Sequence, residues 1–209
     1  MNYKEERNSK FLSYFWDLAS DDDKTRIAAC CNIITFLKEN ESTSSHKSDV
    51  EYAVKRSSRQ SARQGFATCL TEVLRSFSHS SKELTSVDSL LNILEKETRI
   101  TGSVKGAEER DFLFARIFGV LAIVRSGLLL GDVCTGKGTK HYKPHLNSVS
   151  RVLKCLSQVY HAKKWAEEVV TESVFEVLYS VAGAPGDRKV ARAMFCGDNS
   201  DFVDMFQRM

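Results

Sequence analysis

The sequence has few of the residues that interrupt helices and form tight turns. Among its 209 residues there are only two prolines and eleven glycines. A β-sheet protein with many turns needs more of both, so this composition favours long helices joined by short loops. Hydrophobic residues make up 42% and charged residues 27% of the chain, which is ordinary for a globular protein of one domain or two small ones.

The sequence also lacks the common signatures of catalysis and metal binding. Its six cysteines form no Cys-x-x-Cys pair, and the cysteines and histidines do not have the spacing of zinc ligands. The polar segment Met1 to Lys10 leads us to expect no signal peptide and therefore reduced, mostly buried cysteines. A Gly-x-Ser-x-Gly elbow is absent. We expect no cofactor, no metal, no small-molecule substrate and no enzymatic activity.

One phosphate-binding motif is nearly complete. Residues 131–137 read Gly-Asp-Val-Cys-Thr-Gly-Lys and match the GxxxxGK spacing of a P-loop. A P-loop needs a serine or threonine after the lysine, and it follows a β-strand. Here Gly138 follows Lys137, and a long helix is predicted before the motif. We interpret the segment from Gly131 to Pro144 as a flexible surface loop.

Helical periodicity dominates the rest of the chain, and no strand alternation persists. The clearest amphipathic helix is predicted over 61–77, where apolar residues recur at the spacing of one helix face. Similar patterns predict helices near 9–19, 23–37, 87–94, 146–160 and 165–181. In the second of these the expected buried face is Ile27, Cys30, Cys31, Ile34 and Leu37.

The segment from Glu108 to Gly127 is apolar on nearly every side after its charged start. Its apolar part, 112–130, is about as long as a bilayer span, but Arg116 and Arg125 are unfavourable in a membrane. We therefore predict the central helix of an all-α stack with no membrane association. Helix lengths and short loops suit an α-solenoid or a helical bundle, although no sequence repeat has a fixed period.

The net charge of +3 is unevenly distributed. Residues 52–64 hold four cations and residues 133–166 hold seven, with no acid in either stretch. Such stretches suit a surface for nucleic acid or acidic proteins, and a solvated helix face is the alternative. The candidate nucleic-acid-binding residues are Lys55, Arg56, Arg59, Arg63, Lys137, Lys140, Lys143, Lys154, Lys163 and Lys164.

Several segments in combination resemble the N-terminal region of the DNA polymerase phi family. They are FLSYFWDLA at 11–19, VEYAVKR at 50–56, SARQGFATCLTEVL at 61–74 and EERDFLFARIFGVLAIVRSG at 108–127. The resemblance implies a HEAT- or armadillo-like α-solenoid, with a helical-repeat domain over 1–183 and an irregular segment over 184–209. Family members are far longer, so the chain is expected to be a fragment or a shortened gene product.

The resemblance also implies a function. Family members are nucleolar proteins of the nucleus that act in ribosomal RNA gene transcription and ribosome biogenesis. We therefore expect a non-enzymatic scaffold that binds ribosomal DNA or RNA without sequence preference, or nucleolar and transcription-factor proteins. A purely protein-binding co-regulator module is the alternative. A template-directed polymerase is a remote one, because phosphoryl transfer needs metal-holding acids that the sequence does not show.

Overall fold

The computed structural model describes residues 3–40, 49, 52–53, 64–77, 86–102, 104–134 and 140–182. Within these ranges the chain forms seven helices and one two-stranded hairpin. The helices are α1 (Tyr3–Asp17), α2 (Asp23–Glu39), α4 (Gln64–Phe77), α5 (Val87–Glu97), α6 (Ala107–Arg125), α7 (Leu146–Ala162) and α8 (Ala166–Ala182). The strands are β1 (Leu130–Cys134) and β2 (Lys140–Pro144).

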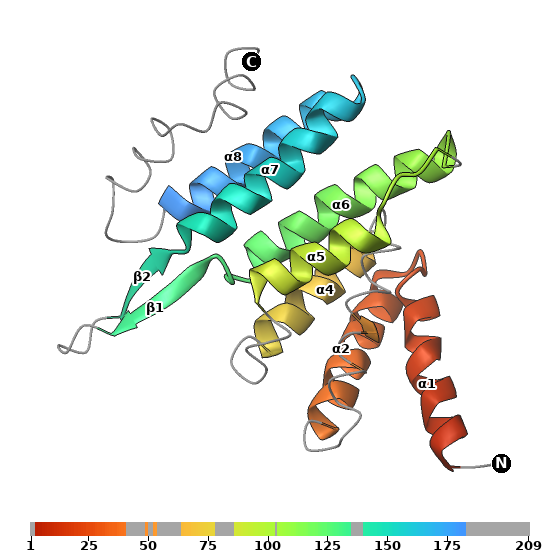
Figure 1. Cartoon of the computed structure of the whole chain (residues 1–209). Coiled ribbons are helices and arrows are strands. Elements are labelled where there is room, and N and C mark those ends of the chain that lie inside the picture. The colour runs from red at the N-terminus through yellow and green to blue at the C-terminus, as the bar shows by residue number, and fades with distance from the viewer. Residues whose placement is uncertain are drawn as a thin grey trace.

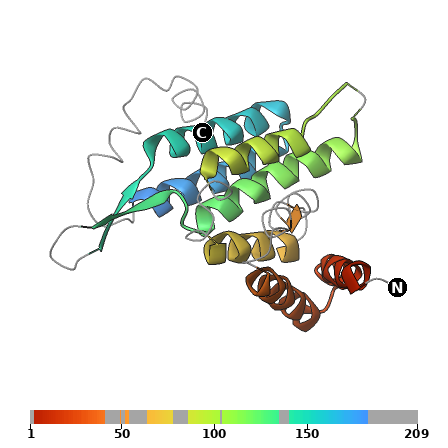
Figure 2. The ribbon, with the colours of Figure 1, turned by 60° about the horizontal axis from the view of Figure 1, so that its bottom comes forward.

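The helices are stacked side by side, with α6 at the centre (Figure 1). Helix α6 packs against α4, α5, α7 and α8, whereas α4 also packs against α2, and α2 against α1. The second view shows α1 and α2 on one side of α4, and α5 to α8 on the other (Figure 2). The predicted helical architecture is confirmed, and the stack is consistent with an α-solenoid. The expected irregular segment 184–209 lies outside the described residues.

Two hydrophobic clusters stabilise the stack, and α4 contributes to both. The larger one, called the C-terminal cluster here, contains Leu70 and Leu74 of α4 together with buried residues of α5 to α8. The smaller one, the N-terminal cluster, contains Phe66 and Phe77 of α4 with buried residues of α1 and α2. The apolar stripe predicted for α4 is buried throughout, because it is wide enough to pack on two sides.

The predicted buried face of α2 is only partly correct, because Leu37 is buried and Cys30 and Ile34 are half-buried. The structure buries Ala29, Ile33 and Leu37, whereas Ile27 is 64% exposed and Cys31 is also exposed. Apolar residues occupy most positions of this helix, so their periodicity does not select one face. Contact with α1 and α4 decides which of them are buried.

Arg116 and Arg125 of α6 are explained by their hydrogen bonds to neighbouring helices. Arg116 donates to the hydroxyl of Thr98 at 3.1 Å and to its carbonyl at 2.8 Å, where α5 ends. Arg125 forms a bidentate pair with Glu176 of α8, with N–O distances of 2.6 and 2.8 Å. Among the described residues, no helix combines the length and apolarity that a membrane span requires.

The loop expected between Gly131 and Pro144 is instead an antiparallel hairpin. Leu130 pairs with Pro144, and Val133 pairs with His141. Each strand contributes five residues, and β2 leads directly into α7. The apolar alternation is too weak to predict these strands, although a Gly-containing connection of three to five residues is a hairpin signal.

Candidate nucleic-acid interface

The basic surface predicted for residues 133–166 is built around α7. One side of this helix is buried in the C-terminal cluster through residues such as Val149, Leu156 and Val159. Its other side faces solvent and carries Lys154 and Gln158. Helix α7 contains no acidic residue, so its solvent face has no negative charge of its own. The amphipathic pattern of the sequence therefore places Lys154 correctly on the outside.

Two cations of this stretch bind acids from other helices instead of facing solvent freely. Arg151 donates to Asp88 at 2.7 Å and to Asn92 at 2.8 Å, which ties α7 to α5. The ammonium of Lys163 lies 3.0 Å from the carboxylate of Glu109 on α6. These pairs contribute to the packing of the stack and partly neutralise both cations.

The other lysines of residues 133–166 that the structure describes lie on α7 or close to its two ends. Lys154 and Lys164 are exposed, and neither has an acidic partner among the described residues. Lys140 and Lys143 belong to β2, at the N-terminal end of α7, whereas Lys164 follows its C-terminal end. Helix α7 has 17 residues and is about 25 Å long at 1.5 Å per residue. Along the chain these lysines are therefore spread over the length of α7 rather than concentrated at one of its ends.

The other candidate residues lie outside the described residues, and their predicted role stays a prediction. They are Lys55, Arg56, Arg59, Arg63 and Lys137.

The near match to a P-loop is not one structurally. The segment before the GK pair is β1, and the described residue after the connection is Lys140 of β2. A P-loop places the start of a helix after its lysine so that backbone N–H groups surround the phosphate. Here the connection joins two antiparallel strands, so the geometry does not suit nucleotide binding.

An aromatic cluster holds the turn between α7 and α8, next to Lys164. The rings of Phe114 and Trp165 lie 4.9 Å apart between centroids. The guanidinium of Arg110 lies 5.6 Å from the ring of Phe114 and 6.0 Å from that of Trp165, within cation–π range. This cluster fixes the backbone that carries Lys163 and Lys164. Sequence reasoning missed it, because its members come from two distant segments.

Helix α8 has the opposite charge to α7. It contains four glutamates and no lysine or arginine, and three of the four are exposed: Glu167, Glu168 and Glu172. The two helices pack against each other. A polyanion bound at Lys154 of α7 and at Lys164 would therefore be repelled if it crossed α8, so α8 borders the basic surface on one side.

No group of three or more His, Cys, Asp or Glu side chains suited to a metal ion occurs within the part of the chain that the structure describes. What the structure does place at the surface of the helical stack is the pair of exposed cations Lys154 and Lys164.

Comparison with known proteins identifies the family. The family model for DNA polymerase phi matches residues 55–196, which is more than half of the chain. The chain belongs to the DNA polymerase phi family. The family resemblance of the sequence is thereby confirmed, and the matched range includes all ten candidate cations.

Curated relatives in the DNA polymerase phi family are regulators and binding proteins by name. The rDNA transcriptional regulator pol5 of Schizosaccharomyces pombe is 28% identical over 176 residues, which cover 81% of this chain and 16% of that protein. Myb-binding protein 1A of Rattus norvegicus is 32% identical over 162 residues, which cover 75% of this chain and 11% of that protein. The chain thus spans less than a fifth of either relative. No solved structure matches the chain.

Proposed function

We propose that this chain is a HEAT- or armadillo-like scaffold that acts in ribosomal RNA gene transcription by binding ribosomal DNA or RNA through lysines on α7 and at its two ends. The observation that carries the proposal is the exposure of Lys154 and Lys164 on a side of the stack where α7 contributes no acid. The name of the fission yeast relative, a regulator of rDNA transcription, supports the choice of nucleic acid. By the same reasoning we place the protein in the nucleus and nucleolus.

Lysines spread over about 25 Å suit the phosphate backbone better than a base-reading contact. Each ammonium is a strongly hydrated point charge that contacts phosphate without reading sequence. The binding should therefore depend steeply on salt and weakly on sequence.

The proposed role is non-enzymatic. The relatives that match are named as a regulator and as binding proteins, not as polymerases. Template-directed synthesis requires acidic side chains that hold metal ions at the transferred phosphoryl group. The exposed acids of α8 instead lie on successive turns of a solvent-facing surface. Such an arrangement favours solubility and repels polyanions.

A second candidate function is that of a protein-binding co-regulator module. It is favoured by apolar surface at the other end of the stack, where Trp16 is 71% and Ile27 is 64% exposed. Exposed aromatic and aliphatic side chains are typical anchors of protein interfaces. The name Myb-binding protein 1A shows that a mammalian relative binds a protein partner.

Fluorescence anisotropy over a salt series distinguishes the two functions. The parent chain is titrated into a labelled ribosomal DNA duplex, an unrelated duplex, a single-stranded RNA and an acidic protein. The logarithm of the affinity for duplex should fall linearly with the logarithm of salt, by about 0.9 per phosphate contact. The triple variant Lys137→Gln, Lys140→Gln, Lys143→Gln should flatten this slope by up to about 3.

A matched variant controls for net charge. Lys10, Lys24 and Lys38 are exposed on α1 and α2, at the other end of the stack from α7 (Figure 1). Their joint replacement by glutamine removes the same three charges and should leave the slope near that of the parent. If both triple variants bind with the parent's affinity and slope, the nucleic-acid function is contradicted. Tight binding to the acidic protein with none to nucleic acid would favour the co-regulator.

A further inference from the structure

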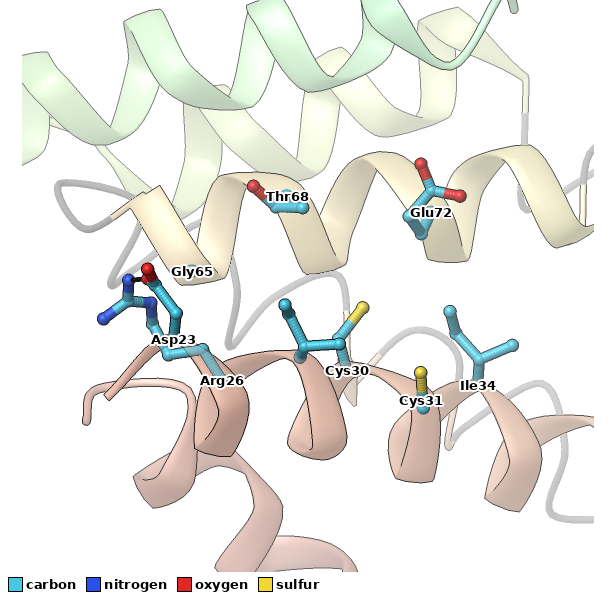
Figure 3. A pocket seen from close by; sticks show the side chains of 9 residues that line it. Asp23, Arg26, Cys30, Cys31, Ile34, Gly65, Thr68 and Glu72 are labelled. Atoms are coloured by element: carbon cyan, nitrogen blue, oxygen red, sulfur yellow. Dashed lines mark ion pairs between the residues drawn. The ribbon is translucent and has the colours of Figure 1, made fainter. Parts of the chain in front are cut away.

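A pocket between α2 and α4 contains two cysteines of one helix facing the other helix. The pocket has a volume of about 470 Å³. Cys30 and Cys31 line it from α2, opposite Gly65, Thr68 and Glu72 of α4 (Figure 3). Cys30 is half-buried and Cys31 is exposed, so small solutes can reach the pocket's thiols from solvent.

A third cysteine lies directly behind Cys30. Cys69 follows Gly65 by four residues and precedes Glu72 by three, so it is on the face of α4 that is turned towards α2. Its side chain is completely buried in the N-terminal cluster, and Cys30 packs against that cluster. The two thiols therefore lie next to each other where α2 packs on α4, and each shifts the pKa of the other.

The two sulfurs differ in reactivity. The hydrogen bond from Cys69 lowers the pKa of Cys30, against the effects of burial and of Glu72. The same bond and burial hold the pKa of Cys69 well above its ordinary value. The thiolate is the reactive form of cysteine. Cys30 is therefore the nucleophile of the pair, and Cys69 is the resolving thiol that stays protonated until Cys30 is oxidised. In the other cluster, burial raises the pKa of Cys155 to about 12, which makes that thiol inert.

We propose that Cys30 and Cys69 form a peroxide-sensitive thiol pair that is oxidised to a disulfide joining α2 to α4. The Cys30 thiolate attacks one oxygen of a hydroperoxide, the O–O bond breaks, and Cys30 becomes a sulfenic acid while hydroxide or alkoxide leaves. The Cys69 sulfur then attacks the Cys30 sulfur, and the S–S bond forms as water leaves with the Cys69 proton. The peroxide is reduced by two electrons, which the two thiols supply. A thiol reductant reverses the step.

The position of Cys31 makes it a poor alternative partner for Cys30. Neighbouring residues of a helix point about 100° apart, and a disulfide between them would break the helix. Cys69 is the better partner, because it belongs to a different helix and lies in the cluster against which Cys30 packs. The bond would fix α2 against α4 at the pocket and thereby stiffen the attachment of α1 and α2 to the rest of the stack.

The test uses the full chain, treated with hydrogen peroxide and then alkylated and digested without reductant. Trypsin is expected to release Cys30 and Cys31 together in peptide 27–38, and Cys69 in peptide 64–75. We expect these two peptides to be joined, with a mass about 2 Da below their sum. The melting temperature of the oxidised chain should rise by roughly 5–15 °C, and dithiothreitol should reverse both changes.

Three single variants assign the sulfurs. Cys31→Ser removes the other cysteine of peptide 27–38 and should leave the crosslink and the melting shift intact. Cys30→Ser should abolish both. Cys69→Ser should abolish both as well, but leave a Cys30 sulfenic acid that dimedone traps. Circular dichroism establishes that each variant is folded.

Several results would overturn the proposal. One is the absence of the 27–38 to 64–75 crosslink in the parent at peroxide concentrations that oxidise free cysteine. Another is loss of the crosslink in Cys31→Ser. A third is dimedone labelling of Cys155 ahead of Cys30. If Cys69→Ser does not fold, the parent and Cys31→Ser still decide the outcome.

Discussion

The two hydrophobic clusters of this chain differ in the type of side chain that fills them and in the polar contacts at their rims. The N-terminal cluster is rich in aromatic side chains, with Phe11 stacked on Phe36 at 4.4 Å and edge-on to Phe15 at 5.4 Å. The C-terminal cluster is mainly aliphatic, with leucine, isoleucine and valine from five helices. Hydrogen bonds and ion pairs such as Arg125–Glu176 tie its helices together at the rim.

This difference separates two kinds of surface. The α1–α2 end presents apolar residues, a pocket and a reactive thiol pair. The α7–α8 end presents charge, with cations along α7 and acids along α8. Helix α4 contributes different residues to the two clusters. A substitution on one of its faces should therefore change the packing of one cluster more than that of the other. The following predictions test how far the two clusters behave as distinct units.

The largest effect is expected at the centre of the C-terminal cluster. Ile117 is fully buried on α6, and Ile117→Ala should lower the free energy of unfolding by about 2–5 kcal/mol. Phe118 is only partly buried, so Phe118→Ala should cost less although it removes a larger side chain. Urea denaturation of both variants measures the difference. Equal losses would mean that α6 is not packed as described.

Two glycines test close helix contacts, one in each cluster. A Cβ on Gly65 would lie 2.5 Å from the backbone oxygen of Leu18, whereas a Cβ on Gly119 would meet the flexible end of Leu94 at 2.6 Å. Backbone cannot move aside as a side chain can, so Gly65→Ala should destabilise by about 1–3 kcal/mol. Gly119→Ala should change stability by less than about 1 kcal/mol, because higher helix propensity offsets the contact. Thermal melts that rank the two in reverse order would contradict this packing.

A smaller effect is expected at the rim of the C-terminal cluster. The Arg125–Glu176 pair is bidentate but partly exposed, so its coupling should be about 0.5–1 kcal/mol. A double-mutant cycle with Arg125→Gln and Glu176→Gln measures it. A coupling above about 2 kcal/mol would instead indicate a desolvated pair.

The smallest effect concerns the start of α2 in the N-terminal cluster. The Asp22 carboxylate accepts hydrogen bonds from the Thr25 hydroxyl and backbone N–H, and these lower its pKa from 3.8. A lowered folded-state pKa stabilises the protein above the unfolded value, and this contribution is lost as pH falls through the folded value. The melting temperature of Asp22→Ala should be below that of the parent at pH 7 and approach it as the pH falls through the lowered pKa of Asp22. A gap that stays constant with pH would rule out a role for the charge.

The sequence predicts the helices well and their packing unevenly. The stripe of α4 is correct because polar residues separate its apolar positions. The face of α2 is wrong in part because apolar residues occupy more than one side of the helix: Ile33 is buried, whereas Ile27 on another side is exposed. The hairpin is missed because its strands contain little apolar alternation, and backbone pairing across the turn decides it.

The candidate site illustrates a similar limit. The run of cations from 133 to 166 is visible in the sequence, but the acids that neutralise Arg151 and Lys163 come from residues more than 50 positions away. Only the fold brings Asp88 and Glu109 to them. Composition can therefore indicate a basic surface, whereas it cannot distinguish the cations available for phosphate from those that hold helices together.

The most direct test of this account compares these two sets of cations. The measurement is the salt dependence of duplex affinity for two double variants of equal charge. Lys154→Gln with Lys164→Gln should flatten the slope by up to about 2 and leave the denaturation midpoint unchanged. Arg151→Gln with Lys163→Gln should leave the slope near the parent's and lower the midpoint, because it breaks contacts to α5 and α6. A slope that changes equally in both variants, or only in the second, would contradict the account.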